Sequence, residues 1–139
     1  MNSRRKSLTV LHVLMACLAL LMTIGVRTFM GPCVHDDGST GMCAAAGQAV
    51  FVSALCMLLL SAAAAAMSGR TGTVLDSVLL VGSIVVAMIP GHLVSICASS
   101  MMHCRMVMQP AVQVISVIDA VMALICLMIR RPRAKQGRR

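Results

Sequence analysis

Four long apolar segments, separated by short polar breaks, set the pattern of this sequence. The segments run approximately over residues 8–30, 44–67, 74–96 and 110–129. Each is long enough to cross a bilayer, because about 20 apolar residues in a helix span the hydrocarbon layer. The pattern predicts an all-α membrane protein in which four transmembrane helices form two antiparallel hairpins, with outer turns at the first and third breaks.

Both outer breaks combine turn-forming residues with a pair of cysteines. The first, over residues 31–43, is the longest polar stretch inside the apolar part of the chain, and its glycines and proline favour turns. The second, over residues 97–104, is shorter. In both, a glutamine follows the second cysteine by five positions. The cysteines are Cys33 and Cys43 in the first break and Cys97 and Cys104 in the second. We therefore expect one cysteine pair at each outer turn.

The middle break, over residues 68–72, predicts a tight polar connection. Thr73 and Asp76 follow it with the spacing of a capping box, so we expect Asp76 to cap the start of the third helix. Pro90 falls inside the third apolar segment, where it is expected to kink the helix. Pro110 is expected in the first turn of the fourth helix, where a missing N–H is tolerated.

The composition of the 139-residue chain fits a membrane protein and excludes other classes. The chain is 59% hydrophobic and only 12% charged, whereas a soluble domain carries about a quarter charged residues. It has no Trp or Tyr and two Phe, which argues against nucleic-acid binding, where bases often stack on aromatic side chains. We expect one transmembrane domain over residues 8–129, between a basic start at 1–7 and a basic tail at 130–139.

The basic residues predict the orientation of the chain in the membrane. Ten of the 12 Lys and Arg lie in the start, the middle break and the tail, and only Arg27 and Arg105 lie toward the other side. Because Lys and Arg concentrate on the cytoplasmic side, we expect a multi-pass protein of the cell membrane with both termini in the cytoplasm. A cleaved signal peptide ending before Cys17 is the competing interpretation, but the apolar run before that cysteine is too short.

The seven cysteines fall into two groups. Three lie inside apolar segments and are expected to be small apolar fillers: Cys17, Cys56 and Cys126. The four in the outer breaks are expected to face an oxidising compartment, where paired thiols form disulfides. Four cysteines allow three pairings. The pairs Cys33–Cys43 and Cys97–Cys104 are favoured because each joins the ends of one hairpin, and structural disulfides are the leading interpretation.

Two alternative interpretations give the same loops a chemical role. Four spans with two outer cysteine pairs also describe membrane enzymes that pass disulfides to quinone, and Arg105 could activate the neighbouring Cys104 thiol. The sequence has no C-x-x-C motif to support this reading. A soft-metal site is the other alternative, because thioether and imidazole groups such as Met42, Met101 and His103 suit Cu(I). Methionine is common throughout the chain, and we expect no cofactor.

Asp119 is the one acid placed deep inside an apolar segment. A charged side chain at that depth is costly and is a functional candidate by default. Only hydroxyls, such as those of Ser53 and Ser83, are expected at matching depth. The acid is therefore expected to be protonated, hydrogen-bonded to Ser116 or a neighbouring helix, or paired with another protein. One deep acid in four spans does not predict an ion pathway.

Several short motifs occur in a specific order along the chain. They are Phe29 to Cys33, Met42–Cys43 followed by Gly47–Ala49, and Ile89–Pro90 ahead of the second cysteine pair. With this order and spacing, the chain from Leu8 to Ile129 resembles an uncharacterised family of small bacterial four-helix membrane proteins, the domain of unknown function 4418. Members of that family often carry a histidine after the second cysteine, where this chain has Ala44. The difference argues against a histidine-based metal or haem site.

The resemblance implies no established activity. Family members often resemble neighbours of ABC exporters of the macrolide or lipoprotein-release type, which implies a small membrane partner of such an exporter. We therefore expect a non-enzymatic integral membrane protein with disulfide-stapled outer loops that is accessory to an ABC-type exporter. The alternative is a membrane thiol–disulfide oxidoreductase, or a redox or soft-metal sensor, that uses the outer cysteines.

Overall fold

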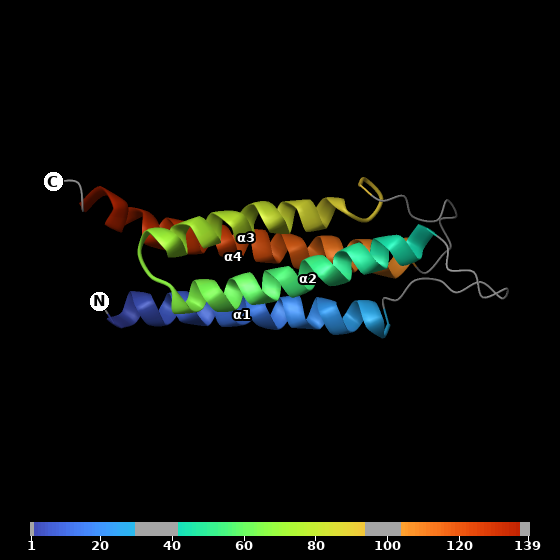
Figure 1. Cartoon of the computed structure of the whole chain (residues 1–139), viewed down its shortest axis with the longest axis horizontal. Helices are drawn as coiled ribbons and strands as arrows, with labels where there is room; N and C mark the ends of the chain where they lie inside the picture. The colour runs from blue at the N-terminus through green and yellow to red at the C-terminus, as the bar shows by residue number, and fades with distance from the viewer. Residues whose placement is uncertain (1, 30–41, 94–103, 137–139) are drawn as a thin grey trace.

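The fold consists of four long helices that lie side by side along one axis (Figure 1). The structure is a computed structural model that describes residues 2–29, 42–93 and 104–136, with the side chains of residues 3–29, 44–93 and 105–130. Its elements are α1 (Asn2–Arg27), α2 (Met42–Ala66), α3 (Arg70–Met88), a π-helical turn η1 (Cys104–Met108) and α4 (Gln109–Gln136).

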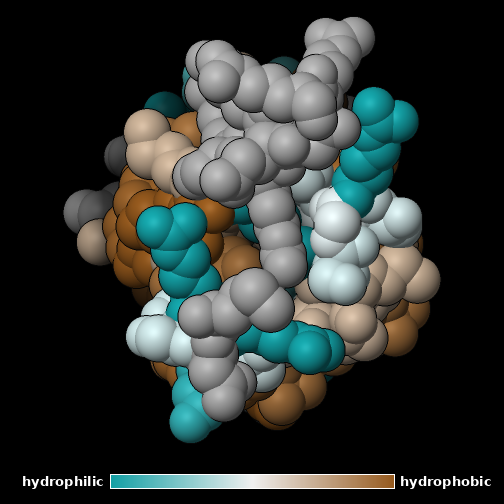
Figure 2. All heavy atoms as spheres, turned by 90° about the vertical axis from the view of Figure 1, so that its left-hand side faces the viewer, coloured by the Kyte–Doolittle hydropathy of each residue, from teal (hydrophilic) through white to brown (hydrophobic). Residues whose placement is uncertain are grey.

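All four helices are long and apolar enough to cross a membrane. A helix satisfies its own backbone hydrogen bonds, which is what the hydrocarbon interior of a bilayer demands. Large apolar side chains are exposed on every helix, and examples are Val13, Leu59, Val81 and Val117. At the end of the bundle that faces the viewer in Figure 2, hydrophilic residues gather beside hydrophobic ones. The predicted all-α membrane fold with four spanning helices is confirmed.

The helices pack mainly as two neighbouring pairs. α1 lies against α2 and α3 lies against α4, and smaller contacts join α2 to α3 and α1 to α4. The start of α1, the end of α4 and the α2–α3 connection share one end of the bundle (Figure 1). Residues 31–41 and 97–103 of the two cysteine-containing turns fall outside the described ranges, so the two-hairpin arrangement with cysteine loops stays a prediction.

The boundaries of α3 differ from those predicted. The helix begins at Arg70 after Gly69, whose φ of 79° suits glycine, and Gly69 provides no side-chain cap. It ends at Met88, so Pro90 follows the helix and does not kink it. Asp76 lies in the second turn and not at the cap, which makes the predicted capping role wrong. By contrast, Pro110 does occupy the first turn of α4.

Two apolar clusters fill the interior at different depths. One includes Val50 of α2 and Val112 of α4, and the other includes Met15 of α1 and Leu79 of α3. Buried alanines contribute to both clusters: Ala19, Ala46, Ala54, Ala64 and Ala123. Small side chains let helix backbones approach closely in lipid, where packing takes the place of the hydrophobic effect. Two polar sites interrupt this apolar interior.

Candidate functional site

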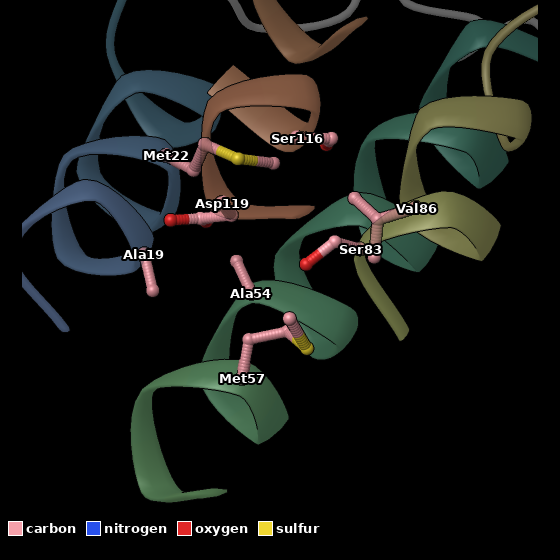
Figure 3. A pocket seen from close by; sticks show the side chains of 8 residues that line it. All are labelled: Ala19, Met22, Ala54, Met57, Ser83, Val86, Ser116 and Asp119. Carbon is pink, nitrogen blue, oxygen red and sulfur yellow. The ribbon is translucent and has the colours of Figure 1, made fainter. Parts of the chain in front are cut away.

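The first polar site is Asp119, which lies inside the bundle on α4. Its side chain is 5% exposed and borders a small cavity between the helices (Figure 3). Residues of all four helices line the cavity: Ala19, Met22, Ala54, Met57, Ser83, Val86, Ser116 and Asp119. The space open to the centre of a water molecule is about 10 Å³. That is close to the minimum that holds one ordered water.

The hydrogen bonds expected for Asp119 are not all formed. Its Oδ1 atom and the Ser116 hydroxyl are both buried without a hydrogen-bond partner among the described residues, so the expected Asp119–Ser116 bond is absent. The Ser83 hydroxyl donates to the Leu79 carbonyl within its own helix at 2.8 Å. Asp119 faces the interior of its own chain, and its pairing with another protein stays a prediction.

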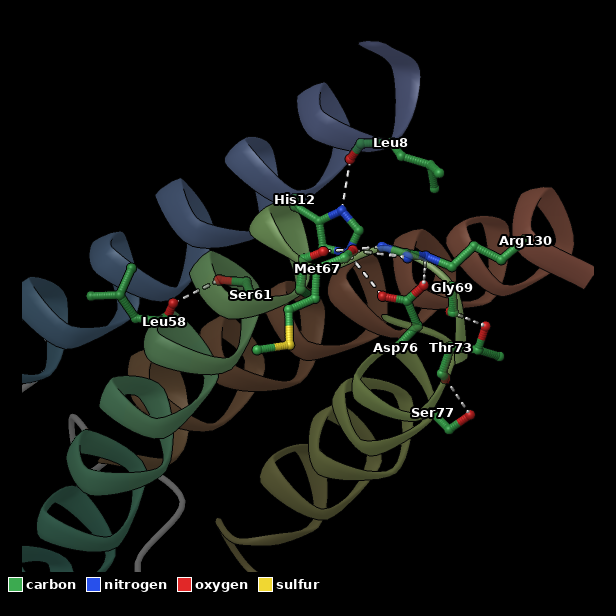
Figure 4. Close-up of polar contacts among 11 residues, drawn as sticks. Leu8, His12, Leu58, Ser61, Met67, Gly69, Thr73, Asp76, Ser77 and Arg130 are labelled. Carbon is green, nitrogen blue, oxygen red and sulfur yellow. Dashed lines mark hydrogen bonds and ion pairs between the residues drawn. The ribbon is translucent and has the colours of Figure 1, made fainter. Parts of the chain in front are cut away.

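The second polar site joins a histidine, an aspartate and an arginine from three helices. Asp76 on α3 is fully buried, and both of its carboxylate oxygens are engaged (Figure 4). His12 Nε2 on α1 lies 2.8 Å from Oδ1, and Arg130 Nε on α4 lies 2.7 Å from Oδ2. The Arg130 contact is an ion pair without the alignment of a hydrogen bond. We call these three residues the His–Asp–Arg network.

The histidine of this network has a second partner in its own helix. His12 Nδ1 lies 2.7 Å from the Leu8 carbonyl oxygen, which can only accept a hydrogen bond. The carboxylate oxygen of Asp76 is also an acceptor when that group is ionised. A ring with a proton on each nitrogen satisfies both partners, and the two contacts fix the orientation of the imidazole.

The arginine extends the network to the remaining helix. Arg130 Nη2 donates to the Ala64 carbonyl at 3.0 Å, and Nη1 donates to the Met67 carbonyl at 3.2 Å. These carbonyls lie at the end of α2, where a helix leaves its last carbonyls without intrahelical donors. Arg130 therefore caps α2 while it pairs with Asp76. One cluster of polar side chains thus connects all four helices at the end where α1 begins.

A glycine makes room for this arrangement. Gly72 is buried in the first turn of α3, and a Cβ atom there would overlap the Arg130 guanidinium and lie 3.0 Å from the Met67 carbonyl oxygen. Gly82 on the same helix differs, because a Cβ there would meet only the flexible end of Met57, with Sδ at 2.9 Å. The position of the Arg130 guanidinium therefore depends on the absence of a side chain at residue 72.

The sequence-predicted residues are distributed unevenly over the described structure. Cys33, Cys97, Met101 and His103 lie outside the described residues. Cys43 and Cys104 lie at the starts of α2 and η1, and Met42 begins α2, but their side chains are outside the described set. The three remaining cysteines are free thiols, with Cys126 buried as expected and Cys17 and Cys56 exposed on the outer surface. No group of three or more possible metal-ligating His, Cys, Asp or Glu residues occurs within the described part of the chain.

The sequence reasoning missed the His–Asp–Arg network. His12 appeared only as an interruption of an apolar segment, Asp76 as a helix cap, and Arg130 as part of a basic tail. The signal that could have found the network is the rule that a buried charge in a span requires a partner. Applied to Asp76 and His12 together, it predicts a contact between the first and third helices.

Fold and polar sites together define a class: a multi-pass, four-helix membrane protein with a buried ionic network that joins its helices. A family model, "Domain of unknown function (DUF4418)", matches residues 14–129, and the chain belongs to that family. Asp76 and Asp119 lie within the matched residues, whereas His12 and Arg130 lie just outside them. No curated protein and no solved structure matches the chain.

Proposed function

We propose that this chain is a non-enzymatic integral membrane protein that acts as an accessory partner of a larger membrane assembly. The observation that carries the proposal is the closed interior of the bundle. Packed apolar clusters fill the described interior, and the cavity beside Asp119 has room for no more than about one water molecule. A bundle filled in this way acts through its outer surface.

The family resemblance supports an ABC-type exporter as the partner. A helix that docks on another membrane protein needs an exposed apolar face with close packing, and each helix of this bundle presents such side chains to its surroundings. In this proposal the cysteine loops lie outside the cell membrane and are stapled by disulfides. The helix ends that carry the basic residues lie in the cytoplasm, as the distribution of Lys and Arg favours.

Site-specific photo-crosslinking in native membranes tests the proposal. A photoreactive residue at exposed Leu59, Val81 or Val117 samples the outer surfaces of α2, α3 and α4. We expect at least one of these positions to crosslink to a single membrane protein, identified by mass as an exporter subunit. Buried Leu79, two residues from Val81 on the same helix, is the matched control and should give no crosslink to another protein.

Co-purification from detergent tests the same proposal with the isolated protein. The tagged chain should co-purify with the crosslinked partner in mild detergent at a fixed ratio. The accessory role would be overturned if the chain purified without a partner and the photoreactive residue at every exposed position captured only lipid.

A further inference from the structure

A groove opens between α1 and α4 at the end where α1 begins. Its α1 side is polar and comes from Ser3, Arg4 and Ser7, whereas its α4 side is apolar. The apolar residues are Ile125, Met128 and Ile129. The groove is open to its surroundings along one side and has about 350 Å³ of space for water-sized groups. A groove with one polar and one apolar wall fits an amphipathic ligand.

The basic residues beside the groove favour an anionic ligand. Arg4 is exposed, and the next two residues, Arg5 and Lys6, are exposed and basic as well. Within the part of the chain that the structure describes, the acids are Asp76 and Asp119, and both are buried. Asp76 already pairs with His12 and Arg130. No described carboxylate is placed to pair with Arg4, so an anion from outside the described residues can pair with its guanidinium.

The polar wall of the groove complements a ligand that carries both a phosphate ester and a hydroxyl group. The Ser7 hydroxyl donates to the Ser3 carbonyl at 3.1 Å, which leaves the Ser7 oxygen free to accept a hydrogen bond from a ligand. The guanidinium of Arg4 offers donors in the planar arrangement that suits phosphate oxygens. Together these groups can contact a phosphate and a neighbouring alcohol.

The apolar wall of the groove complements the apolar part of an amphipathic ligand. Met128 and Ile129 follow Ile125 by three and four residues, so all three lie on one face of α4 and form a stripe. Ile125 and Met128 are 40% and 61% exposed. The stripe lies within the groove and follows the axis of α4, which is the direction an acyl chain takes in a bilayer. Basic pockets between transmembrane helices are known sites for anionic lipid headgroups.

We propose that this groove binds one anionic phospholipid, with the phosphate on Arg4 and an acyl chain along Ile125 and Ile129. A headgroup that carries a hydroxyl, as in phosphatidylglycerol, also satisfies the Ser7 oxygen. The inference concerns a site that the accessory role does not use, and it holds whichever protein the outer surface contacts.

Lipid retention by the purified full-length chain tests the site. The protein in mild detergent is titrated with phosphatidylglycerol or phosphatidylcholine, and bound lipid is counted by native mass spectrometry. We expect one phosphatidylglycerol to bind more tightly than any phosphatidylcholine. Arg4→Gln should weaken that binding about fivefold, since one basic residue near the surface contributes about 1 kcal/mol to the attraction of anionic lipid.

Two control variants separate the groove from diffuse attraction. Arg5→Gln and Arg70→Gln remove the same charge at the same end of the bundle, but neither residue lines the groove. Diffuse attraction alone would cost about the same for each of the three charges, so we expect both controls to lose clearly less affinity for phosphatidylglycerol than Arg4→Gln does. An equal loss in all three variants would show diffuse electrostatics and overturn the site. Thermal unfolding of each variant confirms that it remains folded.

Competition distinguishes a lipid from other anions. Soluble glycerol phosphate lacks acyl chains and should not displace the bound lipid at concentrations equal to those of the lipid. Full displacement would identify a phosphate site and reject the lipid. Ile129→Asn, which makes the apolar wall polar, should lower lipid binding without changing the charge. Binding of an acidic segment of another protein in the groove, with no retained phosphatidylglycerol, would also overturn the proposal.

Discussion

Two buried aspartates in this chain have opposite surroundings. Asp76 has an ion pair and a histidine contact, whereas the Oδ1 atom of Asp119 has no hydrogen-bond partner among the described residues. A buried polar group without a partner costs about 1–3 kcal/mol, and removing one member of a buried ion pair costs about 3–5 kcal/mol. The same substitution at the two positions should therefore have very different effects on stability.

For Asp76, we expect Asp76→Leu to lower the free energy of unfolding by up to about 3–5 kcal/mol, because it leaves the partly buried Arg130 guanidinium without its counter-charge. Arg130→Met should also destabilise, since it removes the cap of α2 as well as the ion pair. The double variant should lose less than the sum of the two single losses. Unfolding in detergent with added denaturant measures all three, and strictly additive losses would contradict the ion pair.

For Asp119, we expect Asp119→Asn to change stability by less than about 1 kcal/mol, because it keeps the shape and the polar character of the side chain. Asp119→Leu should be neutral or stabilising, because it removes an unsatisfied polar atom and adds apolar volume beside a small cavity. The same unfolding assay applies. A loss as large as that of Asp76→Leu would mean that Asp119 has a partner beyond those described.

At the scale of the helices, Gly72 leaves room for the Arg130 guanidinium between α3 and the end of α2. Alanine normally stabilises a helix by about 1 kcal/mol relative to glycine. Gly72→Ala should nevertheless destabilise the protein, because its Cβ would overlap the guanidinium of Arg130. Gly82→Ala is the control and should be neutral or better, since Met57 can move aside. The melting temperatures of both variants test this difference. Equal shifts would contradict the packing of Arg130 against Gly72.

The outer turns carry a second prediction at this scale. If each turn is stapled by a disulfide, alkylation should block Cys33, Cys43, Cys97 and Cys104 only after reduction. Cys33→Ser and Cys104→Ser should each lower stability by about 2–3 kcal/mol or less, as expected for short closed loops. Cys56→Ser, at an exposed free thiol of α2, is the control. Four freely alkylated thiols in fresh membranes would rule out the disulfides and favour a soft-metal site.

The sequence predicted the helices well wherever local pattern decides them. The second apolar segment was predicted at 44–67 and the helix is Met42–Ala66, and Pro110 marks the start of α4 as expected. The prediction failed at α3, where Thr73 and Asp76 have the spacing of a capping box. The partners of Asp76 come from α1 and α4, and His12 lies 64 residues away in the sequence. No local pattern contains that information, because it depends on which helices become neighbours.

At the scale of the whole molecule, the orientation in the membrane is the main open prediction. A reporter that is active only in the cytoplasm should work when fused after Arg139 or inserted at Gly69, and it should be silent at Gly38. The reason is that ten of the 12 Lys and Arg lie at the predicted cytoplasmic end. Activity at Gly38 would contradict the predicted two-hairpin topology.

The His–Asp–Arg network also imposes an order on biosynthesis. Arg130 belongs to α4, so it is made after the other three helices. Until α4 inserts, Asp76 has His12 as a partner but lacks the Arg130 guanidinium, and the last carbonyls of α2 lack their cap. The three-helix precursor therefore enters the membrane with half of the network, and insertion of α4 completes it. A chain truncated before α4 therefore lacks both the Arg130 guanidinium and the helix that packs against α3, and a membrane protease that recognises incompletely assembled helices would meet both defects.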